Sequence, residues 1–333
     1  MVIPLVERMP SPAEKPADHE DLLYWEDAGS GLKAVLAIHS TRLGPAAGGI
    51  RRRAYASMQE AAEDALRLSA AMTAKCALAG LPAGGGKTVM LQHPRVDAPA
   101  AYRALGREIE RLGGRYVCGQ DVGTSSNDLD EVRKTTRHVT PERDTSAPTA
   151  RGVLSALRGT LAALDGSREL AGRTFLVQGL GAVGMKVARA LLEAGGTVVA
   201  TDVQREACDV LVPCALGGVL TPEAAARGPF RAVCGSANNI LASEDAGRVL
   251  HERGVLFAPD FVTSAGGAID GFLLYAQGDS EETHALIERK LDAIEDTTRR
   301  VLDESARRGE PPTAVALRWA RERVAAAPRA GPA

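Results

Sequence analysis

Two lysines with unequal surroundings are the residues with the clearest potential for chemistry. Lys75 stands at the end of a predicted helix, and Lys87 follows three consecutive glycines in the run MTAKCALAGLPAGGGKTVM. Glycines remove side-chain bulk, so an ammonium group can sit in a narrow cleft beside a substrate. Two lysines that share a partly buried cleft lower each other's pKa, because like charge and burial both disfavour the ammonium form. One lysine then acts as a base near neutral pH, while its neighbour stays charged and binds an anion.

Two other interpretations of the lysines stay open on the residues alone. Lys87 and Thr88 are similar to the end of the phosphate-loop pattern GxxxxGK[ST], but that pattern needs a glycine where this chain has Leu81. A nucleoside-triphosphate site is therefore one alternative. Two ordinary solvated lysines are the other.

The run TFLVQGLGAVGMKVARALLEAGGTVVATD predicts a dinucleotide-binding unit. An apolar strand leads into the pattern GxGxxG, and the helix that follows offers free N–H groups to a pyrophosphate. Asp202 ends the next strand, where an acid accepts hydrogen bonds from a ribose and repels a 2′-phosphate, so NAD is expected rather than NADP. A glycine-rich turn without a ligand, and an ordinary solvated Asp202, are the alternatives. The predicted cofactor-binding residues of this run are Gly179, Gly181, Ala182, Val183, Gly184 and Asp202.

Composition limits the class of protein and of partner. The chain has 333 residues, enough for two domains, and 45% hydrophobic residues, which is typical of a globular protein. A formal net charge of -2 and 4% aromatic residues favour a small-molecule partner over nucleic acid. No apolar run is long enough to span a bilayer, and no export signal is expected at the N-terminus. The five cysteines are scattered, so we expect reduced thiols, no metal site and a cytoplasmic protein.

Strands that alternate with helices predict an α/β fold with the active loops at strand ends. The first half is expected to begin with a strand from Gly31 and a glycine-rich turn over 43–51, followed by a helix over 57–74 capped by Ser57 and Glu60. A glycine loop then leads into the strand TVMLQ. A helix over 97–112 and the strand RYVCGQD, which ends in Asp121, complete this half. The second half is expected to contain a polar connection over 141–150, a helix over 151–165, the dinucleotide unit and a helical segment from Ser280.

Seven motifs, in order along the chain, resemble the glutamate, leucine, phenylalanine and valine dehydrogenase family. They are GPAAGGIR (44–51), MTAKCALAGLPAGGGKTVM (72–90), QDVGTSSNDLD (120–130), GLGAVG (179–184), VPCALGGVLT (212–221), GSANNIL (235–241) and APDFVTSAGGAID (258–270). The sequences of these motifs are most similar to those of the phenylalanine and leucine enzymes. The resemblance implies an NAD-dependent L-amino-acid dehydrogenase that forms homo-oligomers. It also implies a substrate-binding and catalytic domain over 1–150 plus 275–333, and a shortened Rossmann NAD-binding domain over 151–274.

The resemblance also implies roles for single residues. Lys75 would bind the substrate carboxylate, and Lys87 would activate water and polarise the carbonyl. Asp121 would exchange protons with the amino nitrogen. Asn239 would bind the substrate, and Gly48 with Gly49 would let it pass close to the backbone. Four more residues are implied at the cofactor: Ala237, Asn238, Thr149 and Ser264.

Substrate specificity is predicted from the position before the double glycine. Glutamate enzymes carry a lysine there, whereas this chain has Ala47, so the substrate side chain should be apolar and bulky. Leu43 and Met72 would line the same pocket, or both are simply core residues.

Three departures from the family pattern keep a second function open. Ser264 replaces the usual Asn, the family's extra helix and strand are missing between Asp202 and Pro213, and the connection over 141–149 is short. A divergent relative could use the same 2-oxo-acid cleft for another reaction, such as carbon–carbon coupling. A non-enzymatic NAD-binding subunit is a third possibility, which the retained Lys75, Lys87 and Asp121 argue against.

Overall fold

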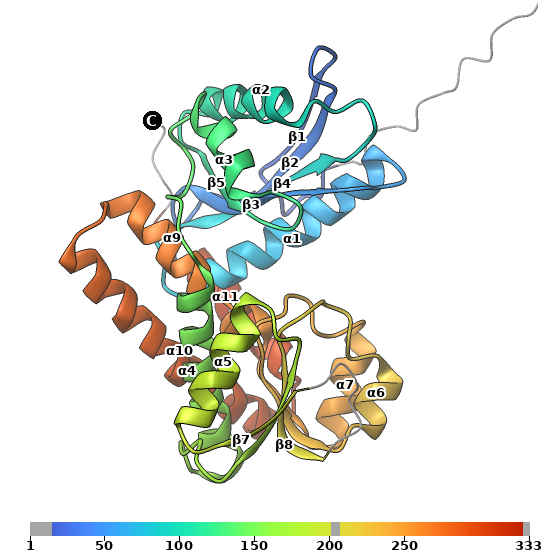
Figure 1. Cartoon of the computed structure of the whole chain (residues 1–333). Helices are drawn as coiled ribbons and strands as arrows, with labels where there is room; N and C mark the ends of the chain where they lie inside the picture. The colour runs from blue at the N-terminus through green and yellow to red at the C-terminus, as the bar shows by residue number, and fades with distance from the viewer. Residues whose placement is uncertain (1–14, 201–206, 329–333) are drawn as a thin grey trace, which may run out of the picture. The chain divides into compact units, whose positions relative to one another are not determined.

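The computed structural model describes residues 15–200 and 207–328, so Asp202 lies outside the described residues (Figure 1). The chain forms two compact units. The first contains the described residues up to Thr73 together with Ala83–Val139, and the second contains Ala74–Pro82 together with the residues from Thr140. Each unit has its own sheet.

The first unit is built on a mixed five-stranded sheet in the order β1-β2-β4-β3-β5. The strand pairs β1–β2 and β2–β4 are antiparallel, and β4–β3 and β3–β5 are parallel. The strands are β1 (Asp21–Asp27), β2 (Leu32–Ser40), β3 (Ala46–Arg53), β4 (Gly84–Leu91) and β5 (Tyr116–Gln120).

Both faces of this sheet are covered, because successive side chains of a strand point to opposite faces. In β2, Leu36 and Ile38 pack in the core under α2 (Ala98–Arg111) and α3 (Ser126–Arg133), while Val35 and Ala37 pack against α1 (Met58–Leu78). Figure 1 shows α2 and α3 beside each other and α1 along the strands. The sheet therefore packs a hydrophobic core against each of its two faces.

Two segments predicted as glycine turns are strands. The run AAGGIRRR forms β3, and the three glycines before Lys87 belong to β4 rather than to a loop. The prediction was wrong because these glycines serve close packing: a Cβ on Gly85 would lie 2.2 Å from Thr73 N, and one on Gly48 would lie 1.8 Å from Gly86 O. At Gly85 the helix α1 lies too close to the sheet for a side chain, and at Gly48 the neighbouring strand β4 does.

The helix α1 starts where the sequence predicts but ends at Leu78, beyond the predicted end at residue 74. Ser57 Oγ accepts a hydrogen bond from Glu60 N at 3.1 Å, which satisfies an N–H group of the first turn. The Glu60 carboxylate accepts one from Ala56 N at 2.7 Å, just before the helix. The helix runs to Leu78, so Lys75 lies in its last turn. A cation there is favourable beside the unpaired carbonyls of the C-terminus.

The second unit contains a parallel five-stranded sheet in the order β10-β9-β8-β6-β7. Its strands are β6 (Thr174–Gln178), β7 (Thr197–Ala200), β8 (Cys208–Pro213), β9 (Phe230–Val233) and β10 (Leu256–Phe257). The chain leaves β6 toward β7 on one side and resumes at β8 on the other side. Ligands bind at such a switch point, outside the carboxyl ends of the strands. The predicted two-domain α/β fold is confirmed.

Helices complete the second unit. They are α4 (Ser146–Asp165), α5 (Ala182–Glu193), α6 (Pro222–Arg227), α7 (Glu244–Glu252), α8 (Asp260–Thr263), α9 (Gly266–Gln277), α10 (Glu281–Arg308) and α11 (Pro312–Ala326). The helix α4 begins at Ser146, so part of the predicted 141–150 connection is helical. The helix α10 begins after the N-cap Ser280, as expected, and packs along α4. The described residues of the segment 275–333 group with the second unit by their contacts. The assignment of this segment to the substrate-binding domain stays a prediction.

Two further features bear on the sequence-based expectations. Among the described residues, β7 pairs with β6 alone and is the edge strand of the sheet. This agrees with the expectation that a strand and a helix of the family are missing at this edge. Within the same residues no helix is both long and apolar enough to cross a membrane.

Replacing Gly85 with Ala tests the packing between β4 and α1. The added methyl would overlap Thr73 N and Ser69 O, both of them backbone atoms, so we expect Gly85→Ala to lower the free energy of unfolding by about 1–3 kcal/mol. Gly29→Ala is the matched control, because its Cβ would meet only Asp27 Oδ2 at 3.6 Å. Urea unfolding compares the variants; equal stabilities of Gly85→Ala and Gly29→Ala would contradict the packing explanation.

Candidate active site

A buried ion pair joins two of the predicted catalytic residues. Lys87 Nζ lies 2.7 Å from Asp121 Oδ2, and the two side chains are only 7% and 15% exposed. Lys87 stands opposite Ala37 in the β2–β4 ladder, so its side chain lies on the face of the sheet that α1 covers. Asp121 follows β5 directly, at the carboxyl end of a parallel strand. The sheet thus brings together an amine and a carboxylate that are far apart in the sequence.

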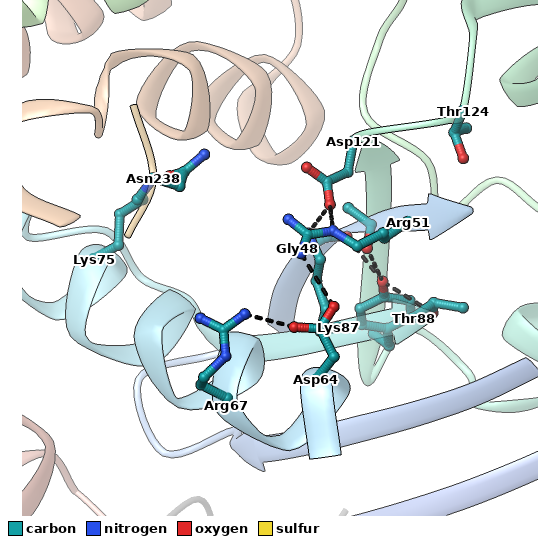
Figure 2. A network of polar contacts seen from close by, with 12 residues as sticks. Gly48, Arg51, Asp64, Arg67, Lys75, Lys87, Thr88, Asp121, Thr124 and Asn238 are labelled. Atoms are coloured by element: carbon teal, nitrogen blue, oxygen red, sulfur yellow. Dashed lines mark hydrogen bonds and ion pairs between the residues drawn. The ribbon is translucent and has the colours of Figure 1, made fainter. Parts of the chain in front are cut away.

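Arg51 completes this pair, and the sequence analysis missed it. Its Nε donates to Asp121 Oδ2 at 2.9 Å and its Nη1 donates to Asp64 Oδ2 at 3.1 Å (Figure 2). Asp64, on α1, also accepts hydrogen bonds from Tyr55 OH and Arg67 Nη2. Charges of alternating sign therefore run from Lys87 through Asp121 and Arg51 to Asp64. The only signal in the sequence is the position of Arg51 at the end of GPAAGGIR.

The pKa values of the pair follow from burial and from these neighbours. Burial lowers the pKa of Lys87, Asp121 acts to raise it, and the like charge of Arg51 adds to the lowering. Burial acts to raise the pKa of Asp121, but Lys87 and Arg51 outweigh this effect and bring it below its ordinary value. Asp121 therefore stays ionised to a lower pH than an ordinary aspartate, and Lys87 loses its proton more readily than an ordinary lysine.

The glycines and Ala47 lie on β3 beside this network. A Cβ on Gly49 would lie 2.8 Å from Asp121 Cβ, so glycine is required for β3 and Asp121 to approach. Ala47 is 7% exposed. Leu43 and Met72 are half-buried. That Gly48 and Gly49 pass close to a substrate, and that Ala47, Leu43 and Met72 line its pocket, stay predictions.

Lys75 belongs to the second unit, where its ammonium group contacts neutral oxygens. Lys75 Nζ donates to Ser264 Oγ at 3.0 Å, and lies 3.4 Å from Ser264 O and from Asn238 Oδ1. Figure 2 shows the Lys75 side chain directed toward Asn238. Ser264 therefore accepts a hydrogen bond from Lys75, although a serine stands here where the family usually has an asparagine. The expected proximity of Lys75 to Lys87 stays a prediction.

The backbone of Asn239 is held in an uncommon conformation. Its φ of 53° lies in the left-handed region, which is uncommon for a residue other than glycine. Its N–H donates to Asp260 Oδ2 at 2.5 Å. Burial raises the pKa of Asp260, which the Asn239 N–H and the charge of Lys75 partly offset. Asp260 therefore fixes the loop that carries Asn238 and Asn239, a role that the sequence analysis did not predict.

The glycine loop after β6 has the shape that a dinucleotide needs. A Cβ on Gly179 would lie 2.5 Å from Ala215 Cβ and one on Gly184 would lie 2.0 Å from Gly179 O, so both positions are closely packed. Gly181, the N-cap of α5, differs: its Cβ would meet nothing within 4 Å. Open space beside a helix N-terminus leaves room for the approach of a phosphate.

Other predicted cofactor residues lie near the carboxyl ends of β8 and β9. Gly218 N donates to Asn239 O at 2.7 Å, which joins the loops that follow these two strands. Ala237 is buried and donates its N–H to Pro213 O. Thr149, on α4, lies beside the N-terminus of α9, because its Oγ1 would be 2.9 Å from a Cβ on Gly267. The residues present therefore fit a dinucleotide.

Two family profiles match the chain. The profile described as "Glu/Leu/Phe/Val dehydrogenase, dimerisation domain" matches residues 23–138. The profile described as "Glutamate/Leucine/Phenylalanine/Valine dehydrogenase" matches residues 142–204 and 201–331. The two segments of the second match meet where the sequence predicts that a helix and a strand of the family are missing.

Individual relatives extend this similarity over both units. A phenylalanine dehydrogenase of Bacillus thermotolerans is 40% identical over 77% of this chain and 76% of its own length. A leucine dehydrogenase of Thermoactinomyces intermedius is 38% identical over 92% and 91%. The crystal structure of L-tryptophan dehydrogenase from Nostoc punctiforme aligns with a TM-score of 0.82 at 32% identity, covering 92% of this chain and 96% of that chain.

Removing the charge of Arg51 tests the alternating-charge network. Arg51→Met leaves Asp64 and Asp121 without their shared cation, so we expect a loss of about 2–4 kcal/mol in unfolding free energy near pH 7. Both carboxyl pKa values are lowered in the folded protein, so this stabilisation is present at neutral pH and is lost as the pH falls. The difference from the wild type should therefore shrink between about pH 5 and pH 3.

Thermal unfolding over this pH range measures the difference. Arg111→Met is the control, because Arg111 forms an exposed pair with Glu108 and should change stability little at any pH. A loss in Arg51→Met that stays constant with pH would indicate that packing, and not charge, explains the effect.

Proposed function

The chain belongs to the glutamate/leucine/phenylalanine/valine dehydrogenase family, and we propose that it catalyses the reversible, NAD-dependent oxidative deamination of an apolar L-amino acid to its 2-oxo acid and ammonia. The family, the fold and the class of amino-acid dehydrogenase predicted from the sequence are confirmed by the relatives. The buried Lys87–Asp121 pair is the observation that carries the proposed chemistry. The relatives named for phenylalanine, leucine and tryptophan support an apolar substrate, and the alternative coupling reaction is not favoured.

Lys87 and Asp121 divide the proton transfers of this reaction. A bound nicotinamide would supply the hydride acceptor for the substrate Cα, so that the amine is oxidised to the imine level. Neutral Lys87 takes a proton from the water that attacks the imine carbon, and the lowered pKa of Lys87 makes this neutral form accessible. Asp121 exchanges protons with the substrate nitrogen, which leaves as ammonia when the carbonyl forms.

Arg51 positions Asp121 for this exchange. Lys87 Nζ and Arg51 Nε both contact Oδ2 of Asp121. Among the described residues Oδ1 forms no hydrogen bond, so Oδ1 is the oxygen that meets the substrate nitrogen. Lys75, which contacts the Ser264 and Asn238 oxygens, binds the substrate carboxylate, and Asn239 is a further substrate contact.

The cofactor is proposed to be NAD, held by the second unit. The loop Gly179–Gly184 and the N-terminus of α5 would hold the pyrophosphate, and Ala237, Asn238, Thr149 and Ser264 would hold the nicotinamide end. The preference for NAD rests on Asp202. If kcat/KM is higher with NADP than with NAD, this part of the proposal is wrong and Arg205 is the candidate phosphate partner. Cytoplasmic location and a homo-oligomeric state belong to the same proposal.

The direct experiment is the absorbance of the reduced nicotinamide when the protein, NAD and an L-amino acid are mixed. Growth of this absorbance with phenylalanine, leucine, tryptophan or valine supports the proposal. No reduction with any of them, while NAD still binds, would contradict it and favour the divergent reaction.

Separate substitutions of the two lysines test their roles. We expect Lys87→Ala to lower kcat by about 10²–10⁴-fold, because the base is removed while the carboxylate anchor remains. Lys75→Ala should chiefly raise KM, by roughly ten- to hundredfold, which is the value of a charged hydrogen bond. Lys33→Ala removes an exposed lysine of β2 and serves as control. Equal effects of Lys75→Ala and Lys87→Ala on KM would refute the division of roles.

Ala47 is the test of substrate size. Without a lysine at this position the second carboxylate of glutamate is unpaired, so glutamate should be a poor substrate. Each methylene that fits the pocket adds about 0.8 kcal/mol, so phenylalanine or another bulky side chain should have a higher kcat/KM than valine. Ala47→Leu should shift preference toward branched aliphatic substrates. A panel led by valine, with phenylalanine inert and Ala47→Leu without effect, would contradict this assignment.

A further inference from the structure

A second cluster of polar side chains lies in the first unit, away from the Lys87–Asp121 pair. In the part of the chain that the structure describes, Asp18, His19 and His39 form a group whose nearest ligand-type atoms all lie within 4.8 Å of one another. No role was predicted for any of them from the sequence. His39 stands in β2 where the register with β4 shifts between Ile38 and Ser40. Such irregularities redirect side chains.

Hydrogen bonds fix which ring nitrogens face the centre of the cluster. His19 Nε2 lies 3.1 Å from Leu66 O, which can only accept, so Nε2 carries a proton. His39 Nδ1 lies 2.9 Å from Thr73 Oγ1, and that hydroxyl can donate onward to Ser69 O. His39 Nδ1 can therefore donate to Thr73, which leaves the lone pair on Nε2.

The remaining nitrogens both face the Asp18 carboxylate. His19 Nδ1 lies 2.9 Å from Asp18 Oδ1, and His39 Nε2 lies 4.0 Å from Asp18 Oδ2. The two rings meet edge to face, with centroids 4.7 Å apart. His19 Nδ1, His39 Nε2 and one carboxylate thus converge, and a metal ion would take the place of the proton that His19 Nδ1 donates to Asp18. Each imidazole is oriented from behind by a backbone carbonyl or a hydroxyl. A hydrogen bond from the second ring nitrogen to a carbonyl or hydroxyl is typical of histidines that bind metal.

We propose that His19 Nδ1, His39 Nε2 and the Asp18 carboxylate bind a divalent transition-metal cation such as Zn²⁺. Two imidazoles and a carboxylate suit Zn²⁺ and its neighbours better than Mg²⁺ or Ca²⁺, which prefer oxygen ligands. Tetrahedral ligands about 2.0–2.2 Å from Zn²⁺ stand roughly 3.3 Å apart. Asp18 has a 71% exposed side chain, so it can move inward to close the site.

The cation would join three elements of the first unit. It would link the residues before β1 to β2, and through Thr73 and Leu66 to α1. His39 contacts Thr73 of α1, so its side chain lies on the α1 face of the sheet, the face on which Lys87 also lies. The expected role is therefore structural support of α1 and β2, and the site does not depend on the proposed function.

Metal binding to the full-length, tag-free protein tests this site. After treatment with a chelator and its removal, Zn²⁺ titrated by calorimetry should bind with one ion per chain, and elemental analysis should find the same ratio. Asp18→Asn and His39→Gln should each weaken binding by about tenfold or more. Asp18→Asn changes an exposed side chain, so its folding should be intact. His284→Gln is the matched control, because it removes an exposed His–Asp pair of the second unit.

The outcomes separate a built site from surface binding. Loss of the single Zn²⁺ in Asp18→Asn and His39→Gln, with full binding in His284→Gln, supports the proposal. Absence of stoichiometric binding to the wild type would overturn it. Equal binding by the wild type, Asp18→Asn and His39→Gln would overturn it as well, since the ion would then lie elsewhere.

Discussion

The burial of one ammonium group is the constraint on which the first unit depends. Lys87 lies on a sheet face under α1 with 7% of its side chain exposed, and an unpaired charge there would cost several kcal/mol. Asp121 at 2.7 Å offsets this cost. Two carboxylates, Asp121 and Asp64, then require Arg51 between them. The network keeps Asp121 ionised and leaves Lys87 with a lowered pKa, and these are the two protonation properties that the proposed reaction uses.

The glycines of this unit follow from the same network. Arg51, Lys87 and Asp121 come from three adjacent strands or their ends, so β3, β4 and β5 must lie close to one another and to α1. Gly49 allows Asp121 to approach β3, and Gly85 allows α1 to approach β4. Side-chain volume is thus removed to bring charges together, whereas in the second unit Gly181 leaves open space beside α5.

Local patterns predicted much of the fold, and long-range contacts account for what they missed. The helices α1, α2 and α4 and the strand β6 follow from periodicity and capping within a few residues. By contrast, β3 looked like a turn, because nothing local indicates that its glycines pack between two strands. Arg51 was missed because Asp121 is 70 residues away in the sequence, and Asp260 because its partner Asn239 is 21 residues away. The roles given to Lys75, Lys87 and Asp121 came from family resemblance, since spacing alone left solvated lysines as an alternative.

The pKa of Lys87, measured by NMR titration of the protein with ¹³C-labelled lysine, tests the central claim most directly. The account predicts a value below the ordinary lysine value of about 10.4 in the wild type. It also predicts a higher value in Arg51→Met, because that substitution removes a like charge from the network. A wild-type Lys87 pKa at or above the ordinary value, unchanged in Arg51→Met, would contradict the account.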